Sequence, residues 1–189
     1  LSKSEYLNFN SLGTQFALPT TSGQKASFLG GTYDSVNKKA IITYRDVNNS
    51  SYGTAVVGTV GENSVTWGTP VVFESAQSQW TSCAFDSTNG KVVISYQDQA
   101  NSFYGTSIVG TVSGNSISFG TPVVFRSSET TYIDTTYDAS AGAIVVNGSF
   151  AGLGGGVVAG TVSGDSITFG STVQFGGTGI YGRAVYHPE

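Results

Sequence analysis

One short run of residues recurs three times along this 189-residue chain, and it constrains the fold more than any other feature. The run Trp67–Phe73 (WGTPVVF) returns 52 residues later at Phe119–Phe125 (FGTPVVF), and a weaker copy stands at Phe169–Phe175 (FGSTVQF). A fixed period near 50 residues is the signature of tandem structural units. An aromatic residue followed by aspartate recurs at the same period, with the aspartates at Asp34, Asp86 and Asp138.

Each repeat predicts four antiparallel strands. The first ends at the aromatic-Asp pair, and β-branched runs such as Ala40–Tyr44 and Val92–Tyr96 predict the second. The third starts at Tyr52 or Tyr104, and the fourth is expected to bend at its internal glycine. With one more strand at each end, the prediction is 3 × 4 + 2 = 14 strands in a single repeat domain. Its parts are a leading strand (1–24), three repeats (25–76, 77–128 and 129–177) and a trailing strand (178–189).

This pattern predicts an all-β fold of antiparallel four-stranded repeats, resembling a β-propeller. A β-trefoil is the alternative, since it also has three units of four strands, and a sandwich or prism is a third option. Three repeats and two end strands do not close a ring comfortably. We therefore expect self-association, as a homo-oligomer or with fibre neighbours, to cover the end units.

Composition excludes several classes of protein. Charged residues make up 11% of the chain, against about 25% in average proteins, and aromatic residues 12%, which argues against disorder. Apolar runs are too short for a membrane span. With 8 basic and 12 acidic residues, the chain carries no basic footprint for nucleic acid. Richness in Gly, Ser, Thr and Asn suggests an extracellular or virion-surface location.

Few residues could carry catalysis or bind a metal. The single cysteine, Cys83, and the single histidine, His187, allow no disulfide, no Cys/His metal site and no plausible catalytic triad. Cys83 is expected to be a small buried apolar residue. The repeated aspartates are expected to cap turns rather than to act as catalytic pairs or bind calcium. The sequence thus predicts no enzyme, no cofactor and no metal.

Carbohydrate binding is the positive hypothesis, because an aromatic face can stack on sugar C–H groups while polar side chains bind hydroxyls. The alternative is that the tyrosines pack between repeats and the polar residues are merely solvated. The third repeat departs from the pattern, with Gly148-Ser149-Phe150 in place of the Tyr-Arg-Asp and Tyr-Gln-Asp triplets. The candidate binding residues are Tyr44, Arg45, Asp46, Tyr52, Trp80, Tyr96, Gln97, Asp98 and Tyr104.

The pattern over residues 85–125 resembles tandem repeats in tail-fibre-like and surface proteins of aquatic bacteria and their phages, and the resemblance covers roughly residues 27–175. It implies a propeller-like fold and carries no catalytic residues. Together these expectations describe a non-enzymatic attachment protein that binds cell-surface glycans through several weak sites. The alternatives are a purely structural, self-assembling fibre or filament subunit, and a fragment of a propeller glycosidase.

Overall fold

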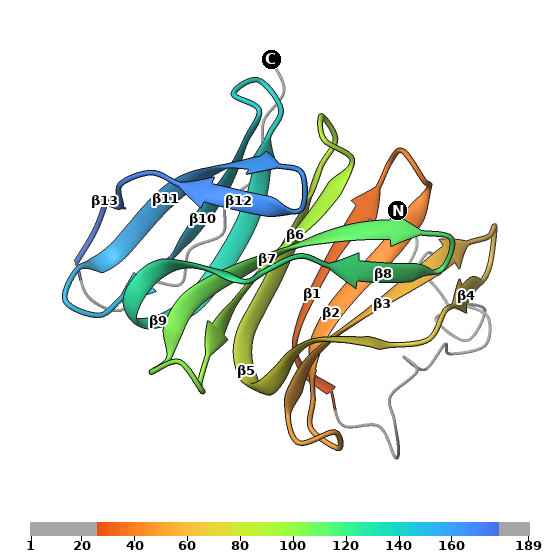
Figure 1. Ribbon diagram of the computed structural model, residues 1–189, viewed down its shortest axis with the longest axis horizontal. Helices are drawn as coiled ribbons and strands as arrows, with labels where there is room; N and C mark the ends of the chain where they lie inside the picture. The colour runs from red at the N-terminus through yellow and green to blue at the C-terminus, as the bar shows by residue number, and fades with distance from the viewer. Residues whose placement is uncertain (1–25, 178–189) are drawn as a thin grey trace, which may run out of the picture.

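The computed structural model describes residues 26–177, which form thirteen β-strands and no helix (Figure 1). All strand pairs are antiparallel, so the all-β, antiparallel prediction is confirmed. The predicted strands in 1–24 and 178–189, and His187, lie outside the described residues. The strands are β1 (Ala26–Asp34), β2 (Lys39–Asp46), β3 (Tyr52–Val60), β4 (Val65–Trp67), β5 (Val71–Asp86), β6 (Lys91–Asp98), β7 (Tyr104–Ser113), β8 (Ser116–Phe119), β9 (Val123–Asp138), β10 (Ala143–Phe150), β11 (Gly154–Ser163), β12 (Ser166–Phe169) and β13 (Val173–Gln174).

The strands pair in chain order, β1-β2-β3-β5-β6-β7-β9-β10-β11, and the sheet is not closed. The short strands β4 and β8 pair with β3 and β7, and both β12 and β13 pair with β11. The predicted fourth strand is interrupted between β4 and β5, at Gly68–Pro70. There the backbone N–H of Gly68 donates to the Val57 carbonyl at 2.8 Å. The bend predicted at the internal glycine of the fourth strand is therefore present.

Two strands of 16 residues, β5 and β9, connect successive parts of the sheet. The first part of β5 pairs with β3 up to Gln77, and the rest, from Ser78, pairs with β6. The repeat boundaries predicted at 76/77 and 128/129 fall inside these continuous strands. No glycine, proline or asparagine stands between Phe73 and Asp86 to turn the chain, so the fourth strand of one repeat runs on as the first strand of the next.

These long strands divide the sheet into three strand groups. The first group is β1–β4 with the first half of β5, and the second is the rest of β5 with β6–β8 and the first half of β9. The third is the rest of β9 with β10–β13. Figure 1 shows the groups following one another across the molecule.

Apolar side chains form two cores, one on each face of the second strand group. Val93 and Ile94 are neighbours in β6 and both are fully buried, but Ile94 packs in a core with Ile41 of β2, whereas Val93 packs in a core with Ile144 of β10. Successive side chains of a strand point to opposite faces. The three strand groups therefore pack face to face, and the second is covered on both sides.

The repeated aspartates cap turns, as predicted. Oδ1 of Asp34 accepts the backbone N–H groups of Val36 and Asn37 at 2.9 and 2.8 Å, and Oδ2 accepts the Asn37 side-chain amide at 2.8 Å. Asp86 makes the same three bonds, and Asp138 accepts the corresponding two backbone N–H groups. Local side-chain acceptors of this kind hold a turn in place.

The turn after Asp34 contains a residue in an unfavourable backbone conformation. Lys38 has a φ of +56°, whereas the matching positions hold glycines, Gly90 at +65° and Gly142 at +63°. The left-handed conformation costs a residue with a Cβ about 1–2 kcal/mol, while glycine adopts it freely. The first of the three turns is therefore the strained one.

We expect Lys38→Gly to raise the free energy of unfolding by about 0.5–1 kcal/mol, because the relief of left-handed strain exceeds glycine's larger entropy in the unfolded chain. Urea unfolding measures the change. Gly90→Lys is the matched control and should destabilise the protein by about 0.5–1 kcal/mol, because the same two effects act with the opposite sign. A loss of stability in Lys38→Gly would contradict the assignment.

Burial raises the pKa of two titratable side chains, those of Cys83 and Glu74. Burial raises the pKa of the Cys83 thiol to about 12, in agreement with the predicted small buried residue. The Tyr96 hydroxyl donates to Oε2 of Glu74 at 3.0 Å. Burial, and next the charge of Asp98, raise the pKa of Glu74, although the Tyr96 hydrogen bond lowers it in part.

A carboxyl with a raised pKa in the folded state stabilises the fold below its unfolded pKa and loses that contribution as pH rises through the folded value. We expect the free energy of unfolding to fall as pH rises above 4.5, the ordinary pKa of this carboxyl, and the decrease to be absent in Glu74→Gln, which keeps an acceptor for Tyr96. Urea midpoints measured across this range test it. The pKa values of Asp138 and Asp165 are lowered from 3.8. These two groups therefore change the free energy of unfolding only below pH 3.8, outside the range in which Glu74 acts.

Candidate binding groove

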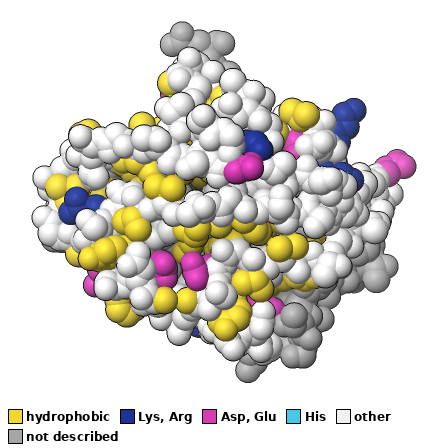
Figure 2. All heavy atoms as spheres, viewed as in Figure 1, with side chains coloured by type: hydrophobic (Ala, Val, Ile, Leu, Met, Phe, Trp, Pro, Cys, Tyr) yellow, Lys and Arg dark blue, Asp and Glu magenta, His cyan; other side chains and the backbone are white. Residues whose placement is uncertain are grey.

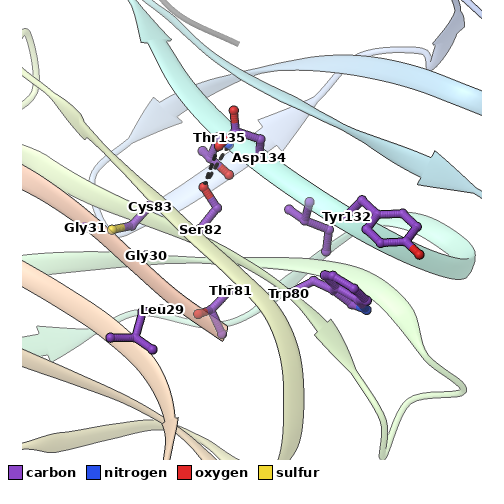
Figure 3. Close-up of a pocket in the computed structure, with 11 residues that line it drawn as sticks. Leu29, Gly30, Gly31, Trp80, Thr81, Ser82, Cys83, Tyr132, Asp134 and Thr135 are labelled. Carbon is purple, nitrogen blue, oxygen red and sulfur yellow. Dashed lines mark hydrogen bonds between the residues drawn. The ribbon is translucent and has the colours of Figure 1, made fainter. Parts of the chain in front are cut away.

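A groove runs along β5 between β1 and β9. One cavity of about 550 Å³ is lined by residues 29–31 of β1, 80–83 of β5 and 132–135 of β9 (Figure 3). A second cavity of about 420 Å³ shares Cys83 and Thr135 with the first and continues toward the capped turns. Within the described residues, these parts of β1, β5 and β9 pair only with β2, β6 and β10, so their other edges face the groove.

Three aromatic side chains stand in a row at the end of the groove away from those turns. The ring centroids of Phe28 and Trp80 are 5.0 Å apart, and those of Trp80 and Tyr132 are 4.4 Å apart, with the ring planes tilted in both pairs. All three side chains are half-buried. We call this row the aromatic ladder; Figure 3 shows Trp80 and Tyr132 side by side at one end of the cavity.

Each residue of the ladder has the same unusual backbone. Phe28, Trp80 and Tyr132 have φ values of +52°, +53° and +54°, and each lies where a β-bulge interrupts the pairing with the neighbouring strand. Glycine is the usual occupant of a left-handed bulge position. Bulky residues held there cost of order 1–3 kcal/mol each and cluster at functional sites. The bulges turn three aromatic rings toward one place.

Polar groups line the groove beyond the ladder. The Ser82 hydroxyl donates to Oδ1 of Asp134 at 3.2 Å and accepts the backbone N–H of Thr135 at 3.0 Å, which ties β5 to β9. The Thr81 hydroxyl donates to the carbonyl of Phe28, which ties β5 to β1. The hydroxyl of Thr135 is buried and has no hydrogen-bond partner in the part of the chain that is described. Hydroxyl and carboxylate groups thus stand next to aromatic rings.

Two of the residues predicted from sequence lie at this ladder. Trp80 is its central ring, and the guanidinium of Arg45 lies over the Phe28 ring at 5.3 Å from the ring centroid. A cation in this position is attracted to the face of the ring. The other predicted residues are elsewhere.

The remaining candidates have roles inside the protein. Tyr44 and Tyr96 are fully buried, so neither ring can stack on a ligand at the surface. Asp46 and Asp98 are buried and accept backbone N–H groups of the turns that follow them, as the repeated aspartates of the other turns do. The hairpin clusters predicted from sequence are therefore occupied by core packing and turn capping.

Gln97, Tyr52 and Tyr104 also lie away from the groove lining. The buried amide of Gln97 donates to the carbonyl of Thr130 at 2.9 Å. Tyr52 and Tyr104 are half-buried and open β3 and β7. Tyr52 and Tyr104 match in the first two repeats and begin equivalent strands, whereas Gln97 stands at the position of Arg45.

Phe28 and Tyr132 were missed as site residues. The repeat period could have identified them, because each stands 52 residues from Trp80. The three positions hold different aromatic residues, so the spacing is the feature that relates them. The polar residues of the groove follow the same period. Ser82 and Asp134 stand at the repeat position of Gly30, and Thr135 stands at that of Gly31, so the residue types differ between repeats. A search for identical residues passes over both sets.

Among the side chains that line the first cavity, that of Asp134 is the one that carries a charge. Figure 2 shows one face of the molecule, on which apolar side chains reach the surface in several places. Within residues 26–177 no cluster of three or more His, Cys, Asp and Glu is arranged to hold a metal ion. The same residues include no helix long and apolar enough to span a membrane. The groove offers ring faces and hydroxyl groups to a ligand.

Comparison of the chain with protein-family models, with curated proteins and with solved structures returned no match.

The left-handed backbone at Trp80 should reverse the usual order of stability of glycine and alanine variants in a strand. In an ordinary strand, glycine is less stable than alanine by about 0.5–1 kcal/mol. At a φ of +53°, Trp80→Gly should instead be more stable than Trp80→Ala by about 1 kcal/mol, because both variants lose the ring contacts and only alanine keeps the left-handed strain. Urea unfolding of the two variants decides the order. A more stable alanine variant would exclude a left-handed residue here.

Proposed function

We propose that this chain is a non-enzymatic attachment protein of an extracellular or virion surface, which binds carbohydrate in the groove along β5. The aromatic ladder carries the proposal. Three rings from three strands form a row at one end of a cavity of about 550 Å³, which Trp80 and Tyr132 line, and each of the three residues has a strained left-handed backbone. Observed strain of this kind supports a functional assignment.

The groove has both kinds of group that a sugar needs. The C–H face of a pyranose would stack on Trp80 and Tyr132, while its hydroxyls would bond to Asp134 and to the Thr135 hydroxyl, which has no hydrogen-bond partner among residues 26–177. A pocket with apolar walls and a few fixed polar groups is typical of small-ligand sites. Because the hairpin clusters are taken up by the core and the turns, we place the site in the groove.

A propeller-like arrangement supports the same proposal. The three strand groups pack face to face, and their inner strands β1, β5 and β9 all line one groove, as the inner strands of propeller blades line a central channel. A β-trefoil closes its strands into a barrel, whereas this sheet stays open. Face-to-face packing of repeated sheets therefore favours the propeller over its alternative.

Tryptophan fluorescence tests the site directly. The chain has two tryptophans, and Trp67 stands where the other repeats have Phe119 and Phe169, so Trp67→Phe leaves Trp80 as the single reporter. This variant would be titrated with a panel of neutral and acidic oligosaccharides. We expect saturable changes in Trp80 emission for at least one glycan class.

Variants distinguish the groove from the hairpin clusters. Tyr132→Ala and Phe28→Ala should weaken glycan binding at least about tenfold, a loss of about 1.4 kcal/mol, as measured by titration calorimetry. Tyr52→Ala and Tyr104→Ala are the matched controls and should bind as the wild type does. Loss of binding only in the controls would place the site on the hairpins and contradict the groove.

A purely structural fibre or filament subunit is the second candidate, and apolar residues exposed on the end groups favour it. Failure of every glycan to bind, with self-association intact, would select this function. The release of reducing sugars from the panel would instead support the glycosidase alternative.

A further inference from the structure

A polar clasp joins the first and second strand groups at the edge away from the groove. The Lys39 ammonium donates to the Thr59 hydroxyl at 2.7 Å and to Oδ1 of Asn115 at 2.9 Å, and the Thr59 hydroxyl donates to the same oxygen at 2.8 Å. Asn115 lies in the hairpin between β7 and β8 of the second group. Its backbone carbonyl lies so close to Gly68 that a Cβ on this glycine would be 1.8 Å from the oxygen.

The same clasp joins the second and third groups. Lys91 donates to Thr111 and to Oδ1 of Asp165, both at 2.7 Å, and the Thr111 hydroxyl donates to Asp165 at 2.9 Å. A Cβ on Gly120 would be 1.9 Å from the Asp165 carbonyl oxygen. In both clasps a hairpin of one group fits a socket of the group before it, formed by a Thr hydroxyl and a glycine without a side chain.

Each end group keeps one unmatched half of this clasp. Asn63 stands in the hairpin between β3 and β4, in the position of Asn115, and it is exposed. Thr161 and Gly170 form the socket of the third group, and both are exposed. A Cβ on Gly170 would meet only the Ala159 carbonyl oxygen, at 3.7 Å. Among residues 26–177, the hairpin and the socket therefore have no counterpart.

Apolar positions that are buried inside the array are exposed at its first face. Tyr33 is 51% exposed, whereas Phe85 and Tyr137 at the same repeat position are 8% and 9% exposed. Val60 is 50% exposed, whereas Val112 and Val162 are 8% and 5% exposed. The preceding group makes the difference, since it covers the second and third groups, whereas within residues 26–177 no group precedes the first.

The last face shows the same contrast. Phe175 is 52% exposed, whereas Phe73 and Phe125 at the same position are 6% and 7% exposed. Phe73 packs on Tyr96 and Phe119 of the next group, with ring centroids 5.1 and 6.0 Å apart. Phe175 is thus a core residue of a junction whose second side is missing from the described residues.

We propose that the first strand group of one copy of this chain docks on the third strand group of a second copy, with Asn63 in the socket formed by Thr161 and Gly170. The contact repeats the interface that is already present twice inside the chain. Its two sides are different surfaces, so association is head-to-tail and gives a closed ring or an open filament. The observations that support this interface do not depend on the proposed glycan site.

Gly170→Ala separates this interface from the stability of the monomer. Among the described residues of one copy the added methyl group meets the Ala159 carbonyl oxygen at an ordinary contact distance of 3.7 Å, so the urea midpoint should stay unchanged. In the docked pair it would collide with a backbone carbonyl, as at Gly68 and Gly120. The full chain should sediment as oligomers whose mass rises with concentration, and the variant should require at least about tenfold more protein to associate. Gly177→Ala, where the added methyl group meets none of the described atoms, is the matched control and should associate normally.

A gain of affinity tests the residue assignment. The third group has Ala143 where Lys39 and Lys91 stand, so its socket lacks the ammonium group. Ala143→Lys combined with Asn63→Asp would recreate the Lys91–Asp165 pair, which has a separation of 2.7 Å. We expect association to tighten about two- to fivefold, and the gain to shrink at high salt because the pair is exposed.

A mixed disulfide tests the head-to-tail geometry. Chains carrying Asn63→Cys would be oxidised together with differently tagged chains carrying Thr161→Cys; the buried Cys83 is not expected to react. The expected product is a dimer containing one chain of each kind. A chain that stays monomeric at every concentration, a Gly170→Ala variant that associates normally, or dimers of like chains only would overturn the proposal. Glycan binding measured on the same samples stays a separate result.

Discussion

The apolar side chains of the second strand group point to both faces of its sheet, so this sheet is stable only with a neighbour on each side. Val93 and Ile94 are adjacent, fully buried and in different cores. Strands buried on both faces carry continuous apolar runs, such as Val92–Ile94 in β6. The outer groups carry related runs but meet only one neighbour among the described residues. The half-exposed Tyr33 and Phe175 follow from this single requirement.

The groove follows from the same packing. Sheets that pack face to face and twist bring their first strands together, and the paired sides of β1, β5 and β9 all face outward, toward β2, β6 and β10. The inner edges approach without forming a ladder of backbone hydrogen bonds, and side chains such as Thr81 and Ser82 connect them instead. The polar lining of the groove is thus a consequence of strand edges that meet without pairing.

Much of the fold could be predicted from the sequence, because turns and alternating apolar residues are local signals. The strand at Ala40–Tyr44 and the aspartate caps depend on neighbours in the chain. The apolar segment around Cys83 indicates its burial, although the core that buries it includes Ile41 of β2. The continuity of β5 could not be predicted in this way. A strand that changes partner at Gln77 and Ser78 has no local signal, because the change is made by long-range pairing with β3 and then β6.

The candidate site was harder to predict than the fold, because residues conserved between repeats are mostly those that build the repeat. Tyr44 and Tyr96 match each other because both are core residues. In the third group Phe150, at the position of Asp98, is buried and packs near Phe125, as Tyr96 packs near Phe73.

The turn before β11 spans residues 151–153, against 99–103 before β7, which accounts for the shift of the period from 52 to 50.

A ligand site is expected among the positions that vary between repeats, because the residues that are identical between repeats are mostly those that build each repeat. Phe28, Trp80 and Tyr132 share a ring and a positive φ but no residue type. Their order also links the two proposals. A second copy docked on the third group would place its Phe28 after Tyr132, as Trp80 follows Phe28 within one chain. Assembly would then extend the aromatic ladder, and weak stacking on each ring would add up along a longer glycan.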